Sequence, residues 1–325
     1  MISGKTEHIH QRDFLEIETP LLIKSTPEGA RDFVVPSRLE AGAWYALPQS
    51  PQLFKQILMI AGCDRYIQIP KCLRDEDPRA DRQAEFTQID LEMSFIDQED
   101  VLDTMGDFAV QLWKETLGVD IGEIPRMTWH ESMETYGIDR PDLRFGLEIS
   151  DISDLAAKTD FKVFHAALEK TSPMGSGVVK AFRVPGGAEK LTRKLTDGYS
   201  EWIKTFGAGG VPTTKCTGDG FESGVGRFVE PIAAELIERL GCEAGDTIFF
   251  TADTWEVATK SIGELRIKVG RDLQLVDESA WKFVWVVDFP MFERDEENER
   301  WVALHHPFTS CNIQYLCACY LHLIC

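Results

Sequence analysis

The chain has 325 residues, 43% hydrophobic and 27% charged, a composition typical of a globular protein with one large or two ordinary domains. Its net charge of −20 argues against a general nucleic-acid binder, because phosphate neutralisation needs lysine and arginine. No apolar run reaches the roughly 20 residues that span a bilayer, and the N-terminus lacks an apolar signal core. We therefore expect a cytoplasmic protein that binds neither membrane nor DNA.

The early part of the chain alternates short strand-like runs with turns. A strand is expected from Phe14 to Ile23, followed by a turn at Thr26-Pro27-Glu28-Gly29 and short strands at 33–35 and 44–47. Four cysteines follow no recognisable spacing and are expected to be reduced thiols: Cys63, Cys72, Cys216 and Cys242.

Ser50-Pro51 predicts a helix start, with a capping hydroxyl followed by proline at the first helical position. Gln52 and Lys55 are three residues apart and share one face of this helix. On another side, the apolar residues can face a core; they are Leu53, Ile57 and Leu58.

A long polar loop, 74–85, joins two strand-like runs, 66–73 and 86–95, and is longer than hairpin loops usually are. After the loop the side chains alternate with period two. Phe86, Gln88, Asp90 and Glu92 point one way, and the opposite face carries Thr87, Ile89, Leu91 and Met93. An aromatic, an amide and two carboxylates indicate the wall of a site for a polar, cationic or nucleotide ligand. The alternative is a solvated outer face under a charged loop.

Helices and glycine-rich links dominate the rest of the chain. Amphipathic helices are expected at 100–117 and 230–240, and a strand-rich run at 283–292 leads to His305-His306. The glycine clusters lack a strand–GxGxxG–helix pattern and are interpreted as turns. A local basic patch for RNA has the following candidates, which can equally be solvated surface cations: Arg79, Arg82, Lys190, Arg193 and Lys194.

The polar loop and its strands resemble motif 2 of the class II aminoacyl-tRNA synthetases, and the detailed match is to the bacterial-type aspartyl-tRNA synthetases. The resemblance runs from Phe14 to about Ser310. It is carried by IETPLLIKSTPEGARDF, YALPQSPQLFKQ, LRDEDPRADRQAEFTQID and ALHHPFTS. The resemblance implies an aspartate–tRNA ligase that joins L-aspartate to ATP as an adenylate and transfers it to tRNA(Asp), with Mg²⁺ as cofactor.

In this family the motif 2 arginine touches both the α-phosphate of ATP and the substrate carboxylate, and Arg74 matches it. A guanidinium is permanently charged and bonds two oxygens at once, which suits that role. Without the match, Arg74 would be an ordinary ion-pair arginine. The resemblance further assigns ATP contacts to Asp75, Glu76 and Gln83, and adenine stacking to Phe86, for which a core aromatic is the alternative.

The resemblance also implies an aspartate site. Glu28, Gln88 and Asp90 match positions that hold the ammonium end, and Lys55, beside Gln52, matches the partner of the side-chain carboxylate. An uncharged amide there would leave a buried lysine unpaired, so Lys55 favours aspartate over asparagine. Two adjacent histidines match a flexible pair that closes on the substrate carboxylate: His305 and His306.

The expected fold is α+β: the antiparallel class II synthetase sheet with flanking helices, interrupted by an inserted α+β domain. We expect the first part of the catalytic domain at 1–149, an inserted GAD-like domain at 150–266, the resumed catalytic domain at 267–310, and an atypical tail at 311–325. The family's anticodon-binding barrel and motif 3 have no counterpart here. Motif 3 supplies a second ATP-clamping arginine and the Mg²⁺ ligands, so we expect no metal ligands in this chain.

Two hypotheses follow. The first is an aspartate–tRNA ligase sequence, truncated at both ends, with impaired activity in this chain and a homodimer in the full-length protein. The second is a non-catalytic fragment or paralogue that binds tRNA, an amino acid or a synthetase partner. A role like that of an amidotransferase subunit would leave the motif 1 and 2 strings unexplained. Aspartate-dependent ATP–pyrophosphate exchange is expected to be slow or absent in the 325-residue chain.

Overall fold

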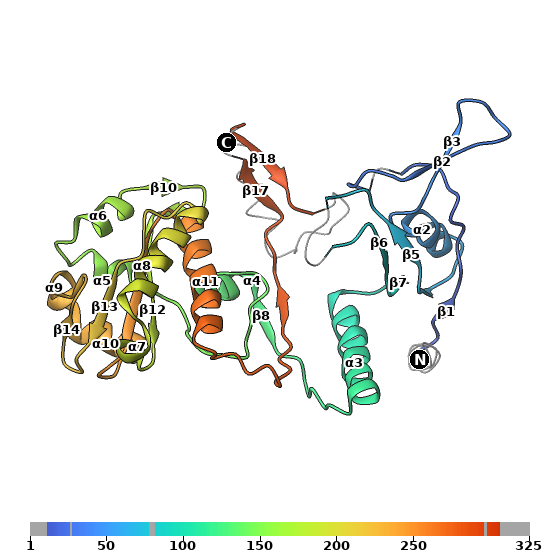
Figure 1. The fold of residues 1–325 in the computed structure, drawn as a ribbon. Helices are drawn as coiled ribbons and strands as arrows, with labels where there is room; N and C mark the ends of the chain where they lie inside the picture. Colours follow the sequence, from blue (N-terminus) through green and yellow to red (C-terminus); the bar gives the residue numbers. More distant parts are fainter. Residues whose placement is uncertain (1–11, 27, 78–81, 296–297, 306–325) are drawn as a thin grey trace. The chain divides into compact units, whose positions relative to one another are not determined.

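The computed structural model describes residues 12–26, 28–77, 82–295 and 298–305 (Figure 1). The chain divides into two compact units between Glu123 and Ile124. Each unit is described by itself. Helices and strands alternate in both, and most strand pairs are antiparallel, as the expected α+β class requires.

The N-terminal unit is built from short ladders and helices. A three-stranded sheet has the order β1-β4-β7, with β4 parallel to β1 and antiparallel to β7. Two further antiparallel pairs are β2 with β3 and β5 with β6. The bounds are β1 Leu15–Glu16, β2 Val34–Pro36, β3 Trp44–Ala46, α2 Gln52–Ile60, β4 Arg65–Gln68, β5 Lys71–Leu73, β6 Glu85–Thr87, β7 Asp90–Met93 and α3 Gln98–Leu117.

The two strands of the long hairpin are each broken in the middle. Pro70 lies in the first break and has no N–H to donate to a ladder, while its carbonyl accepts from the Gln88 backbone N–H at 3.1 Å. The predicted alternation survives the break, because Leu91 and Met93 pack on the small core of this unit. That core is formed by Phe14, Ile67 and Phe108, with Met105 and Leu112 of α3 packed against it.

Helix α3 confirms the expected helix and begins two residues earlier than its predicted start. The Asp97 side chain accepts from the backbone N–H of Asp100, and the Asp100 side chain accepts in return from that of Asp97, which closes a capping box. The helix ends at Gly118, whose φ of 69° is a left-handed conformation that glycine adopts without steric cost.

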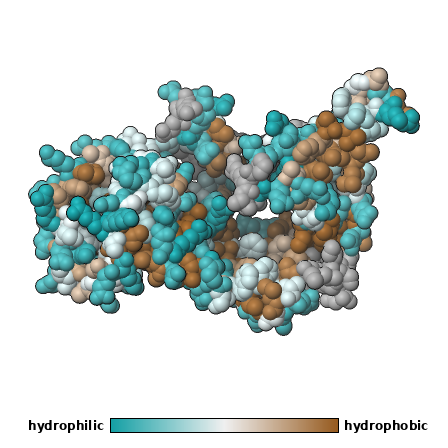
Figure 2. Space-filling view, viewed as in Figure 1, coloured by the Kyte–Doolittle hydropathy of each residue, from teal (hydrophilic) through white to brown (hydrophobic). Residues whose placement is uncertain are grey.

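Two expectations for this unit are wrong. The run from Phe14 to Ile23 forms strand only at β1, and Ile23 makes an isolated bridge to Ala46. Helix α2 buries none of its residues: Leu53 is 40% and Ile57 50% exposed, so its apolar side does not face a core within the part of the chain described. Figure 2 shows hydrophobic side chains on the surface of this unit.

A five-stranded antiparallel sheet, in the order β14-β13-β15-β12-β9, organises the C-terminal unit. β12 (Val178–Val184) and β15 (Thr247–Asp253) pair over their full length at its centre. The remaining bounds are β9 Ser150–Asp151, β13 Thr213–Cys216, β14 Phe221–Glu222, α4 Trp129–Tyr136, α5 Ser153–Ala156, α6 Lys162–Leu168, β10 Thr171–Ser172, β11 Gly175–Ser176, α7 Gly187–Lys190, α8 Arg193–Trp202, η1 Ile203–Phe206, α9 Gly226–Val229, η2 Glu230–Ile232, α10 Ala233–Leu240 and α11 Trp255–Asp272.

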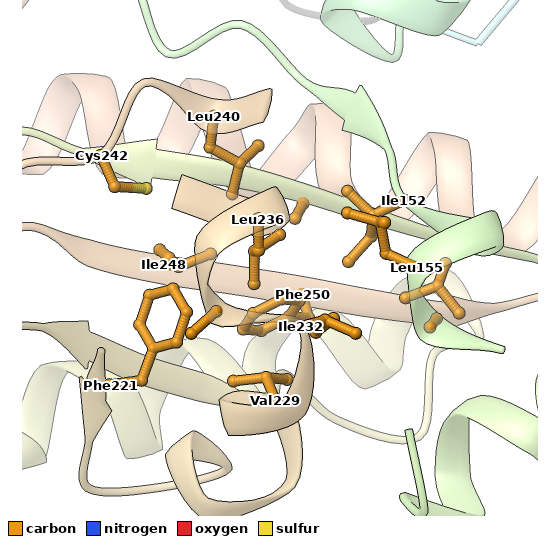
Figure 3. Close-up of a cluster of buried hydrophobic side chains, with 14 of the residues drawn as sticks. Ile152, Leu155, Phe221, Val229, Ile232, Leu236, Leu240, Cys242, Ile248 and Phe250 are labelled. Carbon is orange, nitrogen blue, oxygen red and sulfur yellow. The ribbon is translucent and has the colours of Figure 1, made fainter. Parts of the chain in front are cut away.

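Both faces of this sheet are covered, and alternate residues of its central strands enter different cores. Ile248 and Phe250 of β15 face one core with residues of α5, α6 and α10 (Figure 3). Phe249, between them, faces a second core with residues of α8 and α11. The predicted helix at 230–240 is confirmed as η2 followed by α10, and its buried residues are Ile232, Ala233, Leu236 and Leu240.

Helices α4 and α11 cross at two glycines. A Cβ added at Gly263 would lie 2.5 Å from the Gly137 carbonyl oxygen, so only hydrogen side chains allow this approach. Nearby, the fully buried guanidinium of Arg266 donates to the backbone carbonyls of Asp142, Phe145, Gly146 and Leu147. Burial lowers the pKa of Arg266 to about 10, which keeps it ionised at neutral pH.

A second buried cation, Lys180 of β12, forms an ion pair at 2.6 Å with Glu134 of α4. The Trp255 indole donates to the same carboxylate at 2.7 Å. Burial raises the pKa of Glu134, but the hydrogen bonds and the charge of Lys180 outweigh it and leave that pKa below its ordinary value.

The last elements are short strands. β16 (Trp285–Val287) pairs in parallel with β8 (Arg126–Thr128), and β17 (Phe292–Asp295) forms an antiparallel hairpin with β18 (Arg300–Ala303). The expected strand-rich run at 283–292 is thus divided between two sheets. Helix α11 continues past residue 266, and the proposed limits of an inserted domain stay a prediction.

Candidate functional site

Arg74 follows β5 directly, at the point where the polar loop leaves the ladder. Its backbone N–H donates to the Ala84 carbonyl at 2.8 Å, which holds the two ends of the loop together. Its guanidinium carbon lies 5.1 Å from the ring centroid of Phe86, which pairs with Cys72 on strand β6. Among the described residues, the buried Nε of Arg74 has no hydrogen-bond partner. Arg74 is therefore anchored on an aromatic ring and keeps an unused donor for an anion.

Lys55 of α2 reaches across to β7. Its Nζ lies 2.8 Å from Asp90 Oδ1 and 3.2 Å from Glu92 Oε2, and both the lysine and Asp90 are largely buried. Burial alone would lower the pKa of Lys55, but the hydrogen bonds and charges of Asp90 and Glu92 outweigh it and raise that pKa. The lysine thus stays charged at neutral pH and uses two of its three donors on protein carboxylates.

Glu28 lies in the expected turn and is held by two hydroxyl groups. Its Oε1 accepts from Thr26 at 2.8 Å and its Oε2 from Ser50 at 2.6 Å. Ser50 was expected to cap helix α2; instead, Pro51 is the N-cap residue, the helix begins at Gln52, and no side chain caps it. The hydroxyl is used to join Glu28 to the start of the helix that carries Lys55.

Cys72 marks the place where these side chains converge. Its buried thiol donates to Gln88 Oε1 at 3.1 Å. Burial is the main reason that the pKa of Cys72 rises to about 11; Arg74 and Lys55 act against the rise, and Asp90 and Glu28 add to it. Four of the predicted site residues thus carry charges that act on one thiol. The polar face of the hairpin is turned inward at Asp90, which is 8% exposed, so the solvated alternative is wrong for that residue. On the opposite face, Leu91 and Met93 pack on the core of the unit.

The remaining predicted ATP residues lie along the loop. Asp75 pairs with Arg31 at 3.6 Å and Glu76 with Arg82 at 3.6 Å. A cavity of about 320 Å³ is lined by Arg31, Glu76, Asp77 and Arg82. Gln83 is exposed and Gln52 is half-buried at the start of α2. Arg79 lies outside the described residues.

The two predicted histidines belong to the C-terminal unit. His305 is exposed, and its ring packs edge-on against Phe289 at a centroid distance of 6.2 Å. His306 lies outside the described residues. The basic candidates Arg193 and Lys194 are exposed at the start of α8, where Arg193 faces Asp197 at 3.8 Å.

The sequence interpretation missed four residues that support this site: Ser50, Tyr66, Gln68 and Cys72. The period-two argument, applied to β4 as it was to β7, would have placed Tyr66 and Gln68 on one polar face. Ser50 was predicted only as a helix cap and Cys72 only as a reduced thiol, because their partners, Glu28 and Gln88, are brought to them by the fold.

Within the described ranges, no group of three or more histidine, cysteine or carboxylate side chains could hold a metal ion. Within the same ranges, no helix is both long and apolar enough to cross a membrane. The four predicted thiols, Cys63, Cys72, Cys216 and Cys242, are free.

Comparison with known proteins gives consistent matches. The family model described as tRNA synthetases class II (D, K and N) matches residues 1–317. An aspartate–tRNA ligase of Macrococcus caseolyticus is 50% identical over 305 residues, 93% of this chain and 51% of that protein. Those of Halalkalibacterium halodurans and Staphylococcus aureus (strain Newman) are also 50% identical, over 92% and 94% of this chain and 50% and 51% of theirs.

The chain spans about half the length of the curated relatives it matches. Among solved structures, a putative aspartyl-tRNA synthetase from Leishmania major Friedlin matches 42% of this chain and 28% of its own, at 19% identity and a TM-score of 0.29. That overlap is too small to support an argument about the fold.

Proposed function

Because the chain belongs to the class II tRNA synthetases (D, K and N), we propose that its N-terminal unit activates L-aspartate with ATP for transfer to tRNA(Asp). The observation that carries this proposal is the pairing of a buried lysine with two carboxylates in one site, beside an arginine with an unused donor. An amino acid with a carboxylate at each end and an ammonium between them fits that charge pattern.

The reaction needs two anions to approach each other. An oxygen of the substrate α-carboxylate forms a bond to the α-phosphorus of ATP, and the bond from that phosphorus to the bridging oxygen breaks, releasing pyrophosphate. Arg74 stabilises the charge that develops on the phosphorus, because a guanidinium can bond an oxygen of each reactant. The Phe86 ring beneath it limits its motion, and the same aromatic is proposed to stack on adenine.

Selection of the amino acid rests on Lys55. Its two protein carboxylates leave one N–H for the side-chain carboxylate of the substrate. Asparagine would present an uncharged amide to the third N–H of Lys55, so the lysine would gain no third anion. Glu28, Gln88 and Asp90 are proposed to hold the ammonium end, with Gln52 on the same helix face as Lys55. Roles for His305 and His306 are proposed from the family resemblance alone.

The ATP contacts are proposed at Arg74, Asp75, Glu76 and Gln83. Mg²⁺, tRNA(Asp), a homodimer and a cytoplasmic location are proposed from the family alone. So is the inserted GAD-like domain at 150–266. The alternative is a non-catalytic fragment or paralogue that binds tRNA, an amino acid or a synthetase partner. The following experiment tests the amino-acid selection that the proposed function requires.

Calorimetric titration of the 325-residue chain with L-aspartate, L-asparagine and ATP tests the proposal. L-aspartate should bind at least tenfold more tightly than L-asparagine. Lys55→Ala should lower the affinity for L-aspartate about 30-fold or more, because truncating one partner of a buried charge pair costs about 2–5 kcal/mol of binding free energy. ATP affinity should stay within twofold.

Lys71→Ala is the matched control, since Lys71 is an exposed lysine of the same unit that faces Glu85 at 3.7 Å. It should change neither affinity. Absence of L-aspartate binding to the unaltered chain would refute the proposed function. If Lys55→Ala lowered the affinities for L-aspartate and ATP equally, Lys55 would have a structural role and no role in specificity.

A further inference from the structure

Four polar side chains form a layer on one face of the β4–β7 ladder. The register pairs Tyr66 with Glu92 and Gln68 with Asp90, and residues two apart on a strand point to the same side. Tyr66 is fully buried, Gln68 is 7% exposed and Asp90 8% exposed. Lys55 contacts this layer through both carboxylates. A buried phenol and amide therefore lie directly behind the proposed ammonium site.

The hydrogen bonds of this layer are unevenly distributed. The Tyr66 hydroxyl donates to Gln68 Oε1 at 2.7 Å, and the same oxygen also accepts from the Thr19 hydroxyl at 3.0 Å. Asp90 Oδ1 accepts from Lys55, while Asp90 Oδ2 is buried and has no partner among the described residues. One amide oxygen is thus bonded twice, and one carboxylate oxygen beside it not at all.

Tyr66 is placed where its hydroxyl could donate to the unpaired oxygen of Asp90. Tyr66 and Asp90 are diagonal neighbours across the ladder, a separation that an aromatic side chain can span. Burial, and after it the nearby Asp90 carboxylate through its charge and as a hydrogen-bond acceptor, raises the pKa of Tyr66, so the phenol stays a donor. A hydroxyl hydrogen rotates freely between acceptors, and Gln68 Oε1 would keep its bond from Thr19.

We propose that Tyr66 is a positioning residue for Asp90: its hydroxyl turns from Gln68 to Asp90 Oδ2 and fixes the carboxylate in the orientation that receives the substrate ammonium. The need arises when a third carboxylate, that of the substrate, joins Asp90 and Glu92 on Lys55. All three N–H groups of the lysine are then committed, and none remains to fix the second oxygen of Asp90. This inference rests on the proposed function.

Tyr66→Phe removes only the hydroxyl oxygen and is the test variant. In calorimetric titrations of the 325-residue chain, this variant should bind L-aspartate about tenfold more weakly, the usual effect of deleting one hydrogen bond to a charged group. ATP affinity should stay within twofold, which also shows that the unit is folded. Succinate has both carboxylates but no ammonium, so the affinity for succinate should fall by no more than twofold. Tyr45→Phe, at an exposed tyrosine of the same unit, is the control and should change nothing.

The outcomes separate the two proposals. If the unaltered chain does not bind L-aspartate, the proposed function and this inference both fail. If it binds, and Tyr66→Phe binds L-aspartate within twofold of it, the inference alone is overturned. Equal losses for L-aspartate and ATP, or for L-aspartate and succinate, would also overturn it, because a general weakening of the unit does not single out the ammonium end.

Discussion

The pKa of Cys72 reflects the burial and the charges of the candidate site. Its thiol is fully buried, donates to Gln88 and has both cations and carboxylates as neighbours. Because burial dominates, its pKa rises from 9.0 to about 11. The sign follows from this direction: the folded state favours the protonated thiol, so this contribution to stability is present below pH 9 and is lost as pH rises through about 11.

Cys72 should therefore resist alkylation. At pH 8.5 the raised pKa lowers its thiolate fraction about 100-fold, and burial slows access further. Iodoacetamide labelling followed by peptide mass spectrometry should modify Cys63, which is half-buried, long before Cys72. In urea, Cys63 and Cys72 should be labelled at similar rates. Labelling of Cys72 as fast as Cys63 in the folded chain would contradict the buried, convergent arrangement described here.

At the scale of elements, the crossing of α4 and α11 decides how the C-terminal unit holds together. Gly137 and Gly263 bring the two helix backbones into contact, Arg266 binds the carbonyls that follow α4, and the Lys180–Glu134 pair ties α4 to the sheet. These contacts are long-range in sequence. They make the segment after Ile124 part of the same compact unit as the five-stranded sheet.

Two glycine substitutions should shift stability in opposite directions. Gly263→Ala would place a Cβ 2.5 Å from backbone atoms of Gly137 and should destabilise the chain by about 1–3 kcal/mol. Gly198→Ala, in the middle of α8 with open space around it, should stabilise it by about 0.5–1 kcal/mol through the usual preference of alanine for helix. Urea denaturation of both variants provides the comparison, and equal effects of the same sign would show that the α4–α11 crossing is not tight.

At the scale of the whole molecule, the two units differ in how much apolar surface they bury. The C-terminal unit has two extensive cores, one on each face of its sheet, whereas the core of the N-terminal unit is centred on Phe14, Ile67 and Phe108. The latter unit also exposes large apolar side chains, including Leu39, Trp44 and Ile60. Since burial of apolar surface is the main source of stability, the units should not be equally stable.

We expect the N-terminal unit to unfold first on heating. Differential scanning calorimetry should show two transitions, and hydrogen exchange should be slowest in β12 and β15 of the C-terminal unit. Limited proteolysis should release a fragment that begins within residues 118–125, around the division between the units. A single cooperative transition with uniform exchange protection would contradict this order.

Part of this structure could be predicted from local pattern. Alternation placed Asp90 and Gln88 on the opposite side from Leu91, and the core uses Leu91 as that pattern requires. The break at Pro70 could have been predicted, because proline has no N–H to donate to a ladder. The exposure of Ile57 could not be predicted, because it depends on which elements pack together over long range. The same holds for the site: Glu28, Lys55 and Asp90 were identified through a family resemblance, whereas Tyr66 and Gln68 became visible only through strand register.

The bond from Ser50 to Glu28 has a consequence for laboratory evolution of this chain. Helix α2 starts without a side-chain cap, because its N-cap residue is Pro51 and the hydroxyl of Ser50 is used on Glu28. Pro51 is buried, so a capping carboxylate at that position would lose its hydration. A change that frees Ser50 to cap the helix would release Glu28 instead. Variants enriched for heat resistance and variants enriched for amino-acid binding should therefore diverge at residues 50 and 51, and a library screened for one property would discard the best sequences for the other.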